Sequence, residues 1–230
     1  MTITPTTLAR AAALAAVVAG LAYITIQLIH PADDVASLAT QAWTGVHLLS
    51  FAEAVLALVG VTGVYLRQVR RLGVLGLVGY VLFAFFFVLQ SAFNFAEALI
   101  APLIAVSSRQ LAVDFVGLFG QDPAMTDLGL LAVVPQLGGA LYVVGAIVLG
   151  IAIVRARVLS RGAGILLIAA AAVTPVAGAL LAHPLDRIAA VPMGLALIWL
   201  GVSLWSHPGG DSTERPSSPR ENPLEPALAV

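Results

Sequence analysis

The sequence predicts an all-α, polytopic transmembrane helical bundle of about six spans, with both termini cytoplasmic and a short interfacial helix between spans 3 and 4. Three observations lead to this prediction. Of the 230 residues, 60% are hydrophobic and only 10% are charged, whereas a soluble domain is about half apolar and a quarter charged. The apolar residues gather in runs of about 20, the length that crosses a bilayer as a helix. The basic residues fall mainly in short connections on one side of these runs.

The apolar runs define a transmembrane domain over residues 1–206. Its predicted spans cover residues 8–29, 44–66, 72–105, 128–154, 162–182 and 188–205. The first run is longer than the apolar part of a signal peptide and precedes no clear cleavage site, which favours an uncleaved span. The third run is too long for one straight crossing, and Pro102 is the expected place for a change of direction. Residues 106–126 carry charge and predict the short interfacial helix, capped by Ser107 or Ser108 and ended by Gly120.

The distribution of arginine predicts the orientation. All eleven basic residues are arginines. A cytoplasmic N-terminus places Arg10 and two basic turns inside, and leaves only Arg109 and Arg187 on the far side among the short connections. The topology determinants in the two turns are Arg67, Arg70, Arg71, Arg155, Arg157 and Arg161. Residues 207–230 are rich in proline, serine and charge and predict a disordered cytoplasmic tail, with a docking peptide as the alternative.

Aromatic and small residues suggest how the spans are held. Trp43 precedes the second span, where an interfacial tryptophan anchors a helix. Gly73, Gly76 and Gly79 recur at every third position of the third span, and further glycines thin the fourth. Such small residues allow helices to pack closely inside a bundle or, alternatively, between copies of the chain.

Most polar residues expected at membrane depth lie on one hairpin, residues 44–97. Counting along the helix places Glu53 roughly 14 Å inside its outer end, near the middle of a hydrocarbon layer about 30 Å thick. Residues spaced by three and four on the other arm share one face, at about the level of His47. The ligand-binding or coupling candidates are Glu53, His47, Gln90, Asn94, Glu97 and Gln136, the last at nearly the depth of Glu53. An outer-facing cavity would be rimmed by Gln27, His30, His183, Asp186 and Arg187.

Glu53 is the candidate with the greatest energetic cost. A carboxylate at mid-membrane costs at least about 2–3 kcal/mol, so it faces the bundle interior, pairs, or stays protonated. Three interpretations follow: a neutral carboxyl that joins helices through Gln136 or a backbone carbonyl, a group that couples proton or substrate, or a catalytic group.

Several kinds of chemistry lack support in the sequence. The absence of cysteine excludes disulfides, thiolate nucleophiles and cysteine-ligated clusters. His47 and Glu53 are six residues apart, about 120° around a helix, and do not form the i, i+4 pair of a metalloprotease. No phosphate loop or Gly-x-Ser-x-Gly motif occurs. We therefore predict no catalytic residue, no metal site and no cofactor, and the net charge of −1 gives no reason to expect a nucleic-acid partner.

Three phrases carry a family resemblance: Leu-Ala-Arg-Ala-Ala at 8–12, Phe-Ala-Glu-Ala-Val at 51–55 and Val-Leu-Ser-Arg-Gly-Ala-Gly-Ile-Leu-Leu at 158–167. With them the chain resembles small multispanning bacterial membrane proteins that are grouped under a domain of unknown function. The resemblance implies a bacterial inner-membrane location and about this number of helices. It implies no activity and no functional residue.

The function expected from these observations is non-catalytic. We expect the protein to bind or translocate a small apolar or amphipathic ligand through an outer-half cavity bordered by Glu53, with the lipid bilayer as its other partner. Two alternatives remain: a membrane sensor or interaction subunit whose protein partner the sequence does not identify, and an intramembrane hydrolase-type enzyme that uses His47 with Glu53.

Overall fold

The computed structural model describes residues 3–119, 124–181 and 185–207, and in this part of the chain every regular element is helical. The elements are α1 (Pro5–Ile29), α2 (Val35–Leu38), α3 (Gln41–Leu99), α4 (Ala101–Ser107), α5 (Arg109–Val116), η1 (Gly117–Phe119), η2 (Gly129–Val133), α6 (Val134–Ala156), α7 (Arg161–Leu180), α8 (Leu185–Ile188) and α9 (Val191–Ser206). By length and composition, α1, α3 and the segment Gly129–Ala156 can cross a membrane, and α7 and α9 are shorter apolar helices. Gly120, His183 and the predicted tail from 208 onward lie outside the described residues.

The 59-residue helix α3 is a hairpin with a first arm (41–72) and a second arm (74–99). Its backbone breaks at Gly73, with φ 59° and ψ −162°, a conformation adopted essentially only by glycine. The expectation that the chain turns within the arginine cluster 67–71 is wrong, because arginine and glutamine are good helix formers and a glycine ends the helix just beyond them. Gly76 faces Leu72 beside this bend, so only Gly79 of the three spaced glycines remains for packing between helices.

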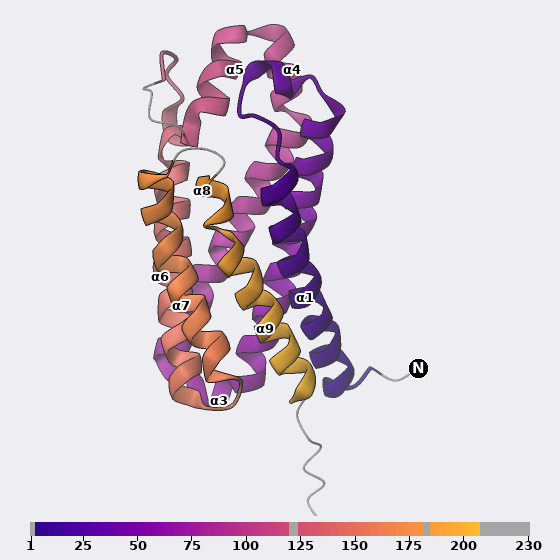
Figure 1. Cartoon of the computed structure of the whole chain (residues 1–230), viewed down its shortest axis with the longest axis vertical. Helices are drawn as coiled ribbons and strands as arrows, with labels where there is room; N and C mark the ends of the chain where they lie inside the picture. Colours follow the sequence, from indigo (N-terminus) through magenta and orange to yellow (C-terminus); the bar gives the residue numbers. More distant parts are fainter. Residues whose placement is uncertain (1–2, 120–123, 182–184, 208–230) are drawn as a thin grey trace, which may run out of the picture.

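The two basic turns lie at the same end of the bundle. Figure 1 shows the bend of α3 and the α6–α7 turn at the bottom, together with the start of α1 and the end of α9, whereas α4 and α5 form the top. At the bottom, Arg67 donates from Nε to the carbonyl oxygen of His207 at 2.6 Å. The guanidinium of Arg10 lies 5.6 Å from the centre of the Trp205 ring. We call the bottom the arginine end and the top the cavity end.

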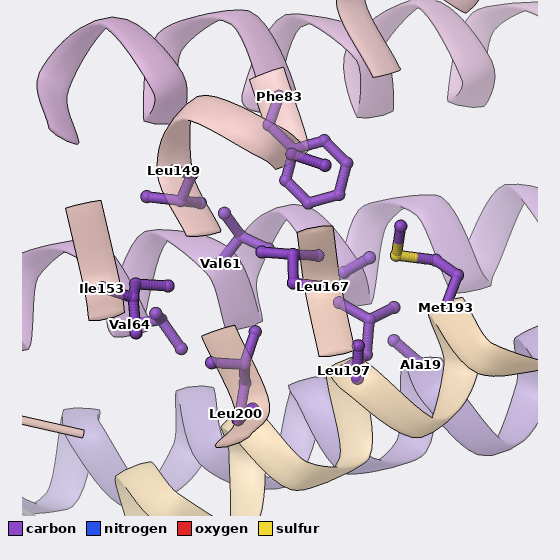
Figure 2. Close-up of a cluster of buried hydrophobic side chains, with 14 of the residues drawn as sticks. Ala19, Val61, Val64, Phe83, Leu149, Ile153, Leu167, Met193, Leu197 and Leu200 are labelled. Atoms are coloured by element: carbon purple, nitrogen blue, oxygen red, sulfur yellow. The ribbon is translucent and has the colours of Figure 1, made fainter. Parts of the chain in front are cut away.

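One apolar core joins all the long helices. Figure 2 shows the following side chains converging on it: Ala19 of α1, Val61, Val64 and Phe83 of α3, Leu149 and Ile153 of α6, Leu167 of α7, and Met193, Leu197 and Leu200 of α9. Phe83, the largest of them, is fully buried. The α3 hairpin is therefore packed into the bundle on both arms.

Glycine brings the second arm of α3 and α6 into backbone contact. A methyl group at Gly79 would lie 2.8 Å from Cα of Leu149, and one at Gly145 would lie 2.8 Å from Cα of Phe83. Each glycine thus faces the backbone of the other helix: Gly79 lies opposite Leu149, and Gly145 lies opposite Phe83. This reciprocal contact fixes the depth at which the second arm lies against α6.

The connection after α3 also differs from the prediction. The second arm ends at Leu99, not at 105, and Pro102 lies in the first turn of α4, where its missing N–H costs no helical hydrogen bond. Ser108, the second of the two expected caps, accepts a hydrogen bond from the backbone N–H of Leu111 at 3.3 Å and begins α5. The predicted single short helix is therefore two helices, α4 and α5.

Asp114 anchors the chain between α5 and α6. Its carboxylate accepts hydrogen bonds from the backbone N–H groups of Thr126 (2.8 Å) and Met125 (3.1 Å) and from the side-chain amide of Gln110 (3.1 Å). These bonds, with Thr126 the strongest influence, lower the pKa of Asp114. Because the pKa of Asp114 is lowered in the folded protein, its carboxylate stabilises this connection at any pH above the ordinary pKa of aspartate. The stabilisation is lost as the pH falls through the lowered pKa.

We therefore expect acid to release this connection before it disturbs the apolar core. Hydrogen-exchange protection of the Met125 and Thr126 amides should be high at pH 7 and should fall only as the pH drops below the ordinary pKa range of aspartate. Asp114→Asn should show reduced protection already at pH 7. Asp127→Asn is the matched control, because Asp127 accepts from the backbone N–H of Gly129 two residues away (2.9 Å); equal loss of protection in both variants would contradict the assignment.

Candidate functional site

A cavity of about 530 Å³ opens at the cavity end. It lies among α1, both arms of α3, the connection that follows α1, the junction of α5 with η1, and α8. Its lining residues are Tyr23, Ile26, Gln27, His30, Asp33, His47, Ser50, Glu53, Gln90, Asn94, Glu97, Val116, Gly117 and Arg187. The structure thus brings together five of the six candidate residues and, at the rim, Gln27, His30 and Arg187; the side chains of His183 and Asp186 are outside what the structure describes.

Glu53 forms the buried floor of this cavity. Its side chain is 0% exposed, and its Oε2 accepts a hydrogen bond from Nε2 of Gln90 at 3.2 Å. The Oε1 atoms of both Glu53 and Gln90 are buried and have no hydrogen-bond partner. Gln90 therefore lies at the level of Glu53, deeper than predicted. Gln136 is exposed on α6 and is not among the lining residues, so the hydrogen bond expected between it and Glu53 is replaced by that of Gln90.

His47 and Glu97 form a second contact, nearer the mouth. The Nδ1 atom of His47 lies 2.8 Å from the backbone carbonyl oxygen of Trp43, and because a carbonyl only accepts, Nδ1 carries hydrogen. The Nε2 atom lies 3.4 Å from Oε2 of Glu97. At this distance the two groups form an ion pair when the imidazole is protonated, whereas a neutral Nε2 could only accept from a protonated Glu97. Glu97, and not Glu53, is therefore the partner of His47.

Trp43 is a structural link between the arms of α3. Its side chain is 1% exposed, its Nε1 donates to the carbonyl oxygen of Glu97 at 2.8 Å, and its ring packs against that of His47 with centroids 4.1 Å apart and the planes tilted by 31°. The expectation of an interfacial anchor is wrong, because the last carbonyls of the second arm lack helical partners and the indole N–H satisfies one of them.

An ion pair crosses the mouth of the cavity. Arg187 of α8 donates from Nη2 to Oδ2 of Asp33, which follows α1. Beside it, Nδ1 of His30 lies 2.7 Å from the carbonyl oxygen of Pro31 and 3.7 Å from Oδ1 of Asp33. Asp33 was not a candidate, since in the sequence it is one of two adjacent aspartates in a loop. Its side chain is 51% exposed, so the pair lies at the entrance and leaves the floor to other groups.

Tyrosines extend the polar region below Glu53. Tyr23 of α1 lines the cavity, and its hydroxyl lies near that of Tyr142. The Tyr142 hydroxyl lies 3.2 Å from Oγ1 of Thr174 on α7. Tyr23 was not a candidate, since its position on α1 resembles that of any buried aromatic residue.

A smaller pocket of about 150 Å³ adjoins the cavity between the second arm of α3 and α6. The two hollows share Gln90, Asn94 and Glu97. The remaining walls of the smaller pocket are apolar: Phe86, Leu89, Phe93, Val134 and Gly138. A molecule could therefore place a polar group in the cavity and an apolar group beside it.

Within residues 3–119, 124–181 and 185–207, no cluster of three or more His, Asp or Glu side chains has the arrangement of a metal site. His183, expected at the rim of the cavity, lies outside the described residues. Comparisons with protein-family models, curated proteins and solved structures give no match to this chain.

Proposed function

We propose that the protein is a six-span integral protein of a bacterial cytoplasmic membrane, with both termini cytoplasmic, and that it binds a small amphipathic ligand in its cavity. The observation that carries the proposal is the union of a buried polar cavity with an apolar pocket through three shared residues. A ligand with both characters satisfies both walls. The bacterial location rests on the family resemblance, and the cytoplasmic position of the termini rests on the positive-inside rule.

The arrangement of the helices supports the topology. The hinge at Gly73 divides α3 into two crossings, and α7 (20 residues) and α9 (16 residues) extend about 30 and 24 Å, close to the thickness of a thin bilayer core. Together with α1 and α6 these segments support the proposed six spans. Both arginine turns lie at the end where α1 begins and α9 ends, which supports the proposal that this end is cytoplasmic and that the cavity lies in the outer half.

The proposal can be tested by single-cysteine labelling, because the chain contains no cysteine. Ser50→Cys places a thiol in the cavity wall, and we expect a charged, membrane-impermeant methanethiosulfonate added outside the cell to modify it. Ser91→Cys is the matched control, since Ser91 also bonds a carbonyl of its own helix but is absent from the cavity lining. Ser206→Cys at the arginine end should react only after permeabilisation.

Ligand binding is then measured as protection of Ser50→Cys. Decylammonium, decanol and decanoate present one chain with three head groups. At least one of them should slow modification of Ser50→Cys at concentrations that leave Ser91→Cys unaffected. If all three fail, or if both thiols are slowed equally, the ligand-binding proposal is wrong; labelling of Ser206→Cys from outside intact cells would contradict the topology.

A further inference from the structure

The floor of the cavity presents hydrogen-bond acceptors that lack donors. Oε1 of Glu53 and Oε1 of Gln90 are both buried and unpartnered, and each belongs to a group whose other polar atom is used in the Glu53–Gln90 hydrogen bond. The two acceptors therefore belong to side chains in direct contact, on the same wall. Leaving a buried acceptor without a donor is unfavourable, so this wall favours a ligand that donates hydrogen bonds.

The charges of the lining point to the same chemistry. The ionisable groups of known position, apart from Tyr23, are Asp33, Glu53, Glu97, Arg187, His30 and His47. Arg187 is paired with Asp33, and His47 lies within ion-pair distance of Glu97. The second histidine of the lining, His30, lies at the mouth of the cavity beside Asp33. No arginine or histidine of the described residues lies within ion-pair distance of Glu53, so its carboxylate is the one acidic group of the lining without a charge partner there.

We propose that the head group of the ligand is an ammonium that carries N–H donors, and that it binds between Glu53 and Gln90. This rests on the proposed ligand-binding function and specifies the class of ligand. An ammonium supplies both missing donors and the missing positive charge, and charge-assisted hydrogen bonds are the stronger kind. The adjoining apolar pocket accepts the hydrocarbon part of the amine.

Other head groups fit the floor less well. A hydroxyl has one donor and leaves the carboxylate without a counter-charge. A carboxylate or phosphate would face Glu53 with like charge in a buried site. A quaternary ammonium carries the charge but no N–H, so it cannot satisfy either oxygen. These differences provide the test.

The experiment measures the concentration of each probe that halves the rate of Ser50→Cys modification in proteoliposomes. The probes are decylammonium, decyltrimethylammonium, decanol and decanoate. We expect decylammonium to protect at a concentration about tenfold or more below the others. Glu53→Gln, which retains the shape and an acceptor for Gln90, should abolish this preference. Asp127→Asn, the matched control, neutralises a carboxyl that lines neither the cavity nor the pocket and should change it by less than about threefold.

Each outcome decides between the possibilities. Loss of the preference in Glu53→Gln but not in Asp127→Asn, with the preference retained in Glu53→Asp, supports the ammonium site even if one variant expresses poorly. Equal protection by decanol or decyltrimethylammonium, or better protection by decanoate, overturns it while leaving the ligand-binding function intact. Preference that survives Glu53→Gln overturns it too. Protection by no probe refutes the proposed function itself, and the ammonium site with it.

Discussion

Gly79→Ala is expected to destabilise the bundle by about 1–3 kcal/mol or more and to lower its Tm in detergent by about 5 °C or more. The added methyl group would lie 2.8 Å from Cα of Leu149 and 2.9 Å from the carbonyl carbon of Val148. Both are backbone atoms of α6 and cannot rotate away as a side chain would. The second arm and α6 must therefore separate, and the contacts around Phe83 in the core loosen with them.

The same helices provide the controls. Gly145→Ala should have a similar effect, since its methyl group would meet the backbone at Phe83. Gly139→Ala on α6 and Gly45→Ala on α3 have open space around the new methyl group and should be neutral or stabilising by up to about 1 kcal/mol, because alanine favours the helix. A Tm for Gly79→Ala equal to that of Gly139→Ala would show that the close contact with α6 is not needed.

The hairpin at the centre of the molecule could be recognised from the sequence because hydropathy and arginine placement are strong signals. The pairs across it could have been found as well. Glu53 and Gln90 lie at nearly equal distances along the chain from Gly73, and so do His47 and Glu97. In two antiparallel helices such residues come to the same level. Placing the turn at the arginines shifted this register and put Gln90 too near the mouth.

Other features depend on information that a single sequence lacks. Counting along a helix gives the depth of a residue but not its direction around the axis, which packing decides. Gln136 has a suitable depth and points away from the cavity, whereas Gln90 faces it. The ion pair of Asp33 with Arg187 joins residues 154 positions apart, and no periodicity connects them. The buried position of Trp43 follows from the carbonyl of Glu97, which only the folded hairpin brings near.

Replacement of both Glu53 and Gln90 is expected to have the largest functional effect. We expect it to retain or raise the stability of the protein and to abolish ligand binding. Gln90→Leu leaves the buried carboxyl of Glu53 without its hydrogen bond and should destabilise the protein by about 1–3 kcal/mol. Glu53→Leu instead leaves the amide of Gln90 without a hydrogen-bond partner, which is also destabilising. Part of this cost is offset because the variant no longer buries a carboxyl group without a counter-charge.

The double variant Glu53→Leu/Gln90→Leu removes all four polar atoms together. Replacing a buried polar or charged pair with apolar side chains is often neutral or stabilising by about 1–4 kcal/mol, so we expect a double variant at least as stable as the natural protein. A thermodynamic cycle of the four proteins, measured by thermal unfolding in the same detergent, gives the coupling between the two side chains. A coupling near zero would mean that the 3.2 Å contact contributes nothing.

The same double variant should lose all protection of Ser50→Cys by decylammonium. Gain of stability with loss of binding is the pattern expected where polar groups are kept for a ligand and not for the fold. A double variant that is strongly destabilised would instead make Glu53 and Gln90 a structural link between the arms of α3, the first of the three interpretations that the sequence left open, with Gln90 as the partner in place of Gln136.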